Sequence, residues 1–156
     1  MSRKIIAPIA AGVLLAMAGA AQAATKTSSF TVTASVAKNC IINAGNLDFG
    51  PFDGATDLDV NSTITVNCTN NTPFNVGLSQ GTYGSFAGRR MRNLVNSEEL
   101  VYNLYTTTAR TTVWDQTTNR VGGLGGGMNV DRLLTVFGSL RGSDNTAPLE
   151  AGSFTD

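Results

Sequence analysis

The sequence contains no histidine, only two cysteines, and few charged residues among its 156 positions. The absence of histidine excludes Ser-His-Asp and Cys-His catalysis and any metal site built on imidazole. Two cysteines without histidine cannot complete a four-ligand zinc site. Acidic and basic residues balance at 11 each and form no basic patch, so nucleic acid is not an expected partner. We therefore expect neither an enzyme active site nor a cofactor.

The first 23 residues differ in composition from the rest of the chain. A basic start is followed by an apolar run from Ile5 to Ala18, and the alanines at positions 21 and 23 fit a signal-peptidase site. A membrane anchor is the alternative, but the run is shorter than the roughly 20 residues of a spanning helix. The pattern predicts a signal peptide at residues 1–23 and one exported domain at residues 24–156.

The predicted export determines how the two cysteines are interpreted. In an oxidising compartment Cys40 and Cys68 most simply form a disulfide, and a buried pair of free thiols is the alternative. A bond that closes a loop of about 28 residues is expected to stabilise a domain by about 3–4 kcal/mol.

Alternation of apolar and polar residues, which is the period of a half-buried β-strand, recurs along the exported part. Threonine and valine are abundant, and no long apolar pattern has the helical period. Short strands separated by frequent turn signals predict an all-β fold, a β-sandwich. The predicted strands cover residues 30–36, 46–52, 62–69, 74–79, 100–106, 113–114 and 133–140, with the approach to another strand at 152–156.

We make further predictions for three stretches outside these strands. The turn at 70–73 predicts a hairpin between the strands on either side of it. Residues 115–131 are polar and rich in glycine, which predicts a mobile surface loop rather than a phosphate-binding loop, because no Lys-Ser or Lys-Thr follows the glycines. The arginines at positions 89, 90 and 92 are expected to form a solvated rim.

Two weaker site signals favour a structural interpretation. Asp53, Asp57 and Asp59 lack the spacing of a calcium-binding loop, so a solvated turn is the better interpretation. Trp114, with the tyrosines, is a possible platform for a sugar ring, although aromatic residues at strand positions more often belong to the core.

The order of several short motifs resembles one known family, the spore coat protein U domain, which is the fold of subunits in archaic chaperone–usher pili. The resemblance covers essentially the whole exported part, and each piece is weak alone. The matching pieces are the alternating strand before Cys40, Leu47-Asp48-Phe49-Gly50, Ile64-Thr65-Val66-Asn67-Cys68-Thr69, Thr72-Pro73-Phe74-Asn75-Val76, Arg90-Met91, Leu100-Val101-Tyr102-Asn103-Leu104-Tyr105, Trp114, Phe137-Gly138 and Ala151-Gly152-Ser153-Phe154-Thr155-Asp156.

The resemblance implies an incomplete immunoglobulin-like sandwich that lacks a strand. In such subunits a periplasmic chaperone lends a strand until an outer-membrane usher exchanges it for the N-terminal strand of the next subunit, by strand addition. The implied donor face is Phe30, Val32, Ala34 and Val36. An ordinary first strand within its own sheet is the alternative for the same residues, because only 16 residues separate Ala24 from Cys40.

The sequence departs from the family pattern at its end. The family continues after the Thr-Asp pair with another alternating strand, and here nothing follows Asp156. This departure suggests a truncated gene or an incomplete record, with a wider groove than the family's.

Two functions from different classes follow. The first is a structural subunit of a surface polymer, a pilus or a protective coat, that travels through the periplasm to the cell surface. The second is a monomeric, secreted, carbohydrate-binding adhesin with a sugar site near Trp114.

Overall fold

The computed structural model describes residues 25–156, and the predicted signal peptide lies outside this range. Residues 25–34 belong to one unit and residues 35–156 form a second unit that holds every described strand. Among the described residues no helix is long and apolar enough to cross a membrane. The elements are β1 (Cys40–Ala44), β2 (Leu58–Cys68), β3 (Pro73–Val76), β4 (Arg89–Asn93), β5 (Glu99–Tyr105), β6 (Val121–Leu124), β7 (Arg132–Leu140), a 3₁₀ turn η1 (Gly142–Asp144) and β8 (Phe154–Thr155).

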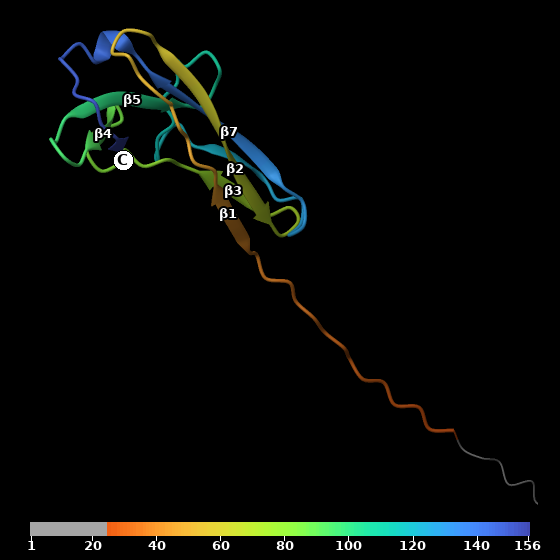
Figure 1. Ribbon diagram of the computed structural model, residues 1–156. Helices are drawn as coiled ribbons and strands as arrows, with labels where there is room; N and C mark the ends of the chain where they lie inside the picture. The colour runs from red at the N-terminus through yellow and green to blue at the C-terminus, as the bar shows by residue number, and fades with distance from the viewer. Residues whose placement is uncertain (1–24) are drawn as a thin grey trace, which may run out of the picture. The chain divides into compact units, whose positions relative to one another are not determined.

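Six strands form one antiparallel sheet in the order β1-β2-β7-β5-β4-β8 (Figure 1). The central pair is the longest, and β2 and β7 run side by side from Leu58 opposite Leu140 to Val66 opposite Arg132. Their burial alternates, as the sequence predicts, because successive side chains of a strand point to opposite faces. In β7 the side chain of Val136 is buried while Leu133 is largely exposed.

A two-stranded sheet, β3 paired with β6, supplies the second layer. Its residues pack against the β2–β7 part of the large sheet and enclose the hydrophobic core. The buried members of this core are Ile64, Val66, Cys68, Val76, Trp114 and Val136. The predicted all-β, immunoglobulin-like sandwich is confirmed, with a second layer that consists of only two strands among residues 25–156.

A disulfide joins Cys40, the first residue of β1, to Cys68, the last residue of β2. The two residues are also direct cross-strand neighbours in the antiparallel pair. The bond therefore fastens the edge strand β1 at the end where the chain enters the sheet. Cys68 is fully buried and belongs to the core, so the predicted disulfide is also part of the packing.

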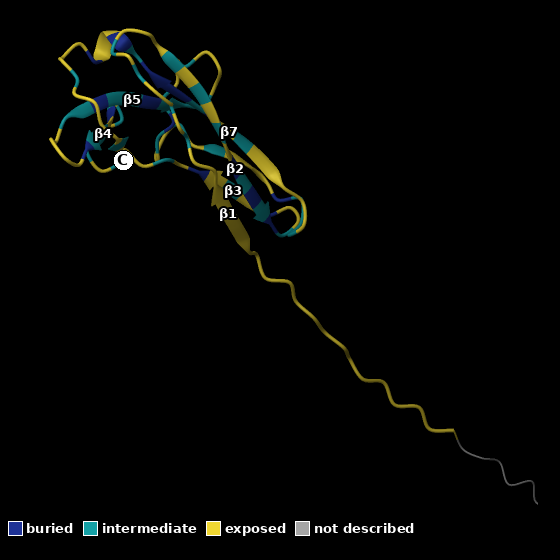
Figure 2. Cartoon of the chain, in the orientation of Figure 1, coloured by how far each residue is buried: buried dark blue, intermediate teal, exposed yellow. Residues whose placement is uncertain are grey.

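The strand predicted at residues 30–36 is absent, and the first strand begins only at Cys40. Residues 25–39 have no assigned secondary structure and all are exposed (Figure 2). The side chains of Phe30, Val32 and Val36 are exposed by 80–88%. Residues 30–36 do alternate between apolar and polar side chains. A β-strand, however, needs a neighbouring strand to satisfy its backbone N–H and C=O groups, and no strand pairs with these residues.

Two further predictions near the start of the domain are wrong. Residues 46–52 form no strand; the Asp48 carboxylate accepts a hydrogen bond from the Gly50 backbone N–H at 2.8 Å, and Gly50 has a positive φ of 73°. The hairpin across residues 70–73 is also absent, because β2 pairs with β1 and β7 while β3 pairs with β6.

The glycine-rich stretch at 115–131 is only partly a loop, because it contains β6. Two glycines of β6 lie where a side chain would collide with β3. A Cβ atom at Gly122 would lie 2.2 Å from the Asn75 side-chain oxygen, and one at Gly123 would lie 3.0 Å from the ring of Phe74. The glycines therefore permit close pairing. The predicted strand at 113–114 is reduced to one bridge between Tyr105 and Val113.

The disulfide predicts a specific loss of stability. Replacing both Cys40 and Cys68 by serine removes a cross-link with a sequence separation of 28 residues. We expect the free energy of unfolding to fall by about 3 kcal/mol, because the unfolded chain regains the entropy of the open loop. Guanidinium unfolding followed by Trp114 fluorescence measures this difference. The reduced natural chain should match the double variant, and a midpoint equal to that of the oxidised chain would contradict the prediction.

Candidate functional site: an apolar groove beside β5

The large sheet extends beyond its second layer, and a groove lies over the part that β3 and β6 leave open. The floor is formed by β5, where Leu100, Tyr102 and Leu104 occupy alternate positions and all line a cavity of about 620 Å³. Alternate residues of a strand share one face, so this spacing produces a continuous apolar strip. Met91 of β4 and Leu140 of β7 extend the strip on either side.

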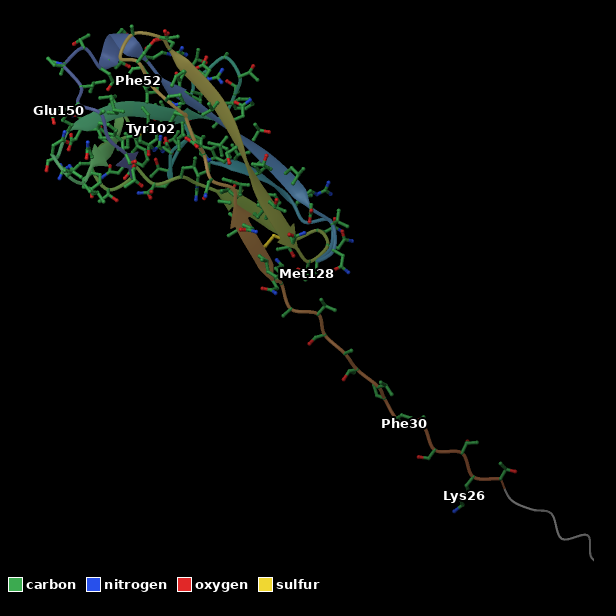
Figure 3. All side chains as sticks on the ribbon, viewed as in Figure 1. Lys26, Phe30, Phe52, Tyr102, Met128 and Glu150 are labelled. Carbon is green, nitrogen blue, oxygen red and sulfur yellow. A yellow bond between two sulfur atoms is a disulfide. The ribbon has the colours of Figure 1, made fainter. Side chains whose placement is uncertain are left out.

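Two segments that are mostly irregular form the walls of the groove. One is residues 47–52, which contributes Leu47, Phe49 and Phe52, and the other is residues 149–156, which includes β8. Figure 3 labels Phe52, Tyr102 and Glu150 at this end of the domain. The ring of Phe49 meets the ring of Tyr102 edge to face, with centroids 5.8 Å apart. The first wall therefore touches the floor at Tyr102.

Tyr102 is the polar point of this floor. Its hydroxyl donates a hydrogen bond to Asp156 Oδ2 at 2.6 Å, and Asp156 Oδ1 accepts a second one from the Thr82 backbone N–H, also at 2.6 Å. Burial, reinforced by the bond to the Asp156 carboxylate, raises the pKa of Tyr102 well above its ordinary value. The raised pKa favours the neutral phenol, and the hydrogen bond to Asp156 orients its hydroxyl.

The charges along the groove are of one sign. Its charged lining residues are Asp48, Glu150 and Asp156, and no basic side chain lines it. Among residues 25–156 no group of three or more potential metal ligands comes together. The groove therefore combines a floor that is half-buried at Tyr102 and Leu104 with carboxylates at its acidic margins, Asp48 and Glu150, and beside Tyr102, which suits a partner with basic groups.

Arg89 lies at the start of β4 and is buried, with 1% of its surface exposed, so the predicted solvated rim is wrong at this position. Its guanidinium donates to three oxygens: the Ser79 carbonyl at 2.8 Å, the Asn103 side chain at 2.6 Å and the Trp114 carbonyl at 2.6 Å. Burial lowers the pKa of Arg89, because the charged form loses its water. Arg90, the next residue, is exposed and pairs with Glu99 at the surface.

The structure places the predicted donor residues and the groove in different parts of the chain. Phe30, Val32, Ala34 and Val36 all lie in the exposed segment before β1, with no strand around them. Their role as a donor face stays a prediction. The disulfide residues Cys40 and Cys68 line neither wall nor floor of the groove and hold the β1–β2 edge instead.

Trp114, the possible sugar platform, is fully buried in the hydrophobic core. Its indole N–H donates a hydrogen bond to the Val76 carbonyl at 3.0 Å. No face of the ring is open to a ligand, and the structure therefore matches the core interpretation that the sequence favoured.

Sequence reasoning missed most of the groove. The β5 strip was recognised as one face of a strand, but nothing in the alternation says that its covering layer is missing. The contribution of residues 47–52 was also missed, because Leu47 and Phe49 were assigned to a strand rather than to a wall. The signal that remained was the approach to a strand predicted at residues 152–156, where Phe154 and Thr155 pair with β4.

Comparison with known proteins places the chain in a family. Residues 26–156 match the Spore Coat Protein U domain. The chain belongs to the Spore Coat Protein U domain family. A curated relative, "Protein U" of Myxococcus xanthus, is 31% identical over 169 residues, which cover 97% of this chain and 92% of the relative. The family suggested by the motif order is thus confirmed.

A solved structure supports the fold. The chain resembles a chain of the CsuC–CsuE chaperone–tip adhesion subunit pre-assembly complex from archaic chaperone–usher Csu pili of Acinetobacter baumannii, with a TM-score of 0.56 and 22% identity. The match covers 78% of this chain and 38% of the other chain. At this identity the likeness concerns the fold alone.

The burial of the Arg89 guanidinium predicts a loss of stability on substitution, and the neighbouring Arg90 provides an exposed control. Arg89→Met keeps an apolar side chain of similar length but leaves the carbonyl oxygens of Ser79 and Trp114 without their donor. We expect a loss of about 2–4 kcal/mol in the free energy of unfolding. Arg90→Met, one residue away and exposed, should change it by less than about 0.5 kcal/mol. Urea unfolding of the two variants measures both values, and equal effects would contradict the structural distinction between them.

Proposed function

We propose that this protein is a structural subunit of an exported surface polymer, a pilus or a coat, whose copies join by strand addition. In this proposal the segment that carries Phe30, Val32, Ala34 and Val36 leaves one copy and enters the groove of the next. The carrying observation is that one sequence holds two complementary features: a groove over β5 that only residues 47–52 and 149–156 border, and an exposed alternating segment without a sheet.

The chemistry of the two features is complementary. An extended strand places alternate side chains on one face, so the four apolar residues from Phe30 to Val36 can face the floor together over about 20 Å. The alternating hydroxyl residues Thr31, Thr33 and Ser35 then face away from it. Backbone groups along the outer edge of β8, which pairs with β4 on its other side, offer hydrogen bonds to an added strand.

Charge supports a second copy of this chain as the occupant. Residues 25–39 contain two charged side chains, Lys26 and Lys38, and both are basic. They lie outside the apolar positions, one before Phe30 and one after Val36, whereas the charges that line the groove are all acidic. Opposite charges at the margins assist encounter and disfavour wrong partners, while apolar contacts provide most of the affinity.

Family membership supports the remaining parts of the proposal. A periplasmic chaperone covers the groove before assembly, an outer-membrane usher mediates the exchange, and residues 1–23 direct export. The comparison complex joins a chaperone to a tip adhesion subunit, which is consistent with such a partner. The carbohydrate-binding alternative has no comparable support, because Trp114 is enclosed by the core.

A synthetic peptide of residues 26–38 tests the proposed donor. We expect it to raise the melting temperature of the full chain by at least about 5 °C at 100 times its dissociation constant, because it binds only the folded groove. A Val32→Asp peptide should give no shift, since an unpaired carboxylate would be buried against the floor. A Thr33→Asp peptide is the matched control and should act like the natural one, because position 33 faces outward. Equal shifts from both Asp peptides, or no shift from the natural peptide, would refute strand addition by this segment.

Salt provides a separate prediction for the flanking lysines. Raising NaCl from about 0.05 M to about 0.5 M should weaken binding of the natural peptide about three- to tenfold, because exposed opposite charges are screened. A peptide with Lys26→Gln and Lys38→Gln should bind more weakly at low salt and respond little to added salt. Isothermal calorimetry gives both dissociation constants. A natural peptide insensitive to salt would exclude a role for the acidic margins.

A further inference from the structure

We propose that the free edge of β1 is a second interaction surface and that its partner is the same edge of another copy of this chain, paired antiparallel about a two-fold axis through Ile42. In the proposed function, copies join head to tail at the groove and β8. The β1 contact lies at the other side of the molecule, because β1 and β8 are the two outer strands of the six-stranded sheet. It does not require the groove to be occupied.

The backbone groups of β1 that point away from the sheet follow from the bonds on either side of the strand. The Asn39 carbonyl accepts a hydrogen bond from the Thr69 N–H, and the Gly45 N–H donates one to the Thr63 carbonyl, both at 2.9 Å. In an antiparallel pair the N–H and C=O of one residue point to the same side, and this side alternates along the strand. The odd-numbered residues of β1 therefore bond to β2, and the even-numbered residues point outward. These are Cys40, Ile42 and Ala44.

The strand β1 lacks the features by which proteins usually protect a sheet edge. Such edges are commonly blocked by a charged side chain, a proline or a β-bulge. The sequence of β1 is Cys-Ile-Ile-Asn-Ala, and its five residues pair with β2 one to one, without a bulge. All five are exposed, Ile41 by 56% and Ile42 by 58%. Within residues 25–156 no strand pairs with the outer side of β1, so this edge is open to another chain.

Two identical β1 edges complement each other when the two-fold axis passes through Ile42. Contacts about such an axis are reciprocal, so Ile42 then faces Ile42 of the second copy, and Cys40 of each copy faces Ala44 of the other. All of these residues point outward, and each facing pair exchanges two hydrogen bonds, which gives about six bonds. An axis through Ile41 or Asn43 leaves only two such pairs within β1 and about four bonds.

The side chains are compatible with this register. Ile42 is the direct cross-strand neighbour of Val66, which is buried in the core, so both lie on the same face of the sheet. Ile42 against Ile42 therefore continues the apolar face across the contact. The charged side chain nearest to β1 is Lys38, two residues before it, and in this register it faces Asn46 of the second copy. No like charges oppose the pairing.

The contact is small, and its size determines how it acts. Five residues on each side are far fewer than the roughly 20–30 of a standard interface, so we expect a dissociation constant of about 0.1–1 mM for two isolated copies. In a polymer the same edge recurs in every copy, and many weak contacts between two neighbouring polymers act together. Strand addition alone produces a filament, whereas the β1 contact adds the side-by-side association that a layered coat needs.

Sedimentation equilibrium at up to about 1 mM protein tests the contact. Every sample is the mature chain with Val32→Asp, which is expected to keep the donor segment out of the groove. We expect a reversible monomer–dimer equilibrium that Ile42→Asp weakens at least about tenfold, because two carboxylates would face each other at the axis. Leu133→Asp is the matched control, since Leu133 of β7 is similarly exposed, and it should change the dissociation constant less than about twofold. Urea midpoints measured on dilute monomer show whether both variants are folded.

Cross-linking determines the register. The same chain receives one added cysteine, as Ile41→Cys, Ile42→Cys or Asn43→Cys, and is incubated under mild oxidation. Facing residues of a hydrogen-bonded pair have Cα atoms about 5.5 Å apart, within the reach of a disulfide. Only position 42 meets its own copy at the proposed axis, so the Ile42→Cys dimer should form at least about tenfold faster than the other two. Mass spectrometry identifies the linked peptides and checks that the Cys40–Cys68 bond is intact.

The outcomes separate this contact from strand addition. A chain that stays monomeric at about 1 mM, or equal weakening by Ile42→Asp and Leu133→Asp, overturns the β1 contact. Fastest cross-linking at position 41 or 43 overturns the axis through Ile42. Neither result bears on strand addition, which the peptide of residues 26–38 tests through the melting temperature.

Discussion

The structure depends on one constraint: the apolar face of a six-stranded sheet must be covered along its whole width. The second layer in the described part of the chain has two strands, β3 and β6, and they cover the β2–β7 end, where Val66, Val76 and Val136 are buried. Over β5 the cover consists of residues 47–52 and 149–156, which leave a cavity of about 620 Å³. Leu100 and Leu140 are almost fully buried there, whereas Tyr102 and Leu104 are only half-buried, so a partner that covers these two side chains would gain stability.

The sequence predicted those parts of the fold in which alternation is carried by side chains. The strands β2, β5 and β7 were expected within a few residues of their observed bounds, and the disulfide followed from export. Pairing was harder to predict. The strand β6 contains Gly122 and Gly123, which show no apolar–polar alternation. Only the folded structure shows that these glycines leave room for the side chains of β3. Residues 30–36 show that a strand pattern can exist without a strand, because the pattern describes a face and not its partner.

The candidate site was harder still to predict, because its character comes from what surrounds each residue. Arg89 and Arg90 look alike in the sequence, yet consecutive residues of a strand point to opposite faces, so one is buried and the other is exposed. Tyr102 appeared as one of several strand aromatics. Its contacts at the groove are with Phe49 and Asp156, which lie 53 and 54 residues away in the chain and meet it only after folding.

If the donor segment links copies into a polymer, the disulfide lies where a pulling force would enter the domain. The segment joins the domain at Cys40, the first residue of the edge strand β1. A pull on that segment would load the β1–β2 pair at its end, where the hydrogen bonds of an edge strand can break one after another. The bond from Cys40 to Cys68 stands at this end, and Cys68 is buried in the core. Force would therefore pass covalently from the segment into β2 and the centre of the sheet, before any β1 hydrogen bond has to carry it.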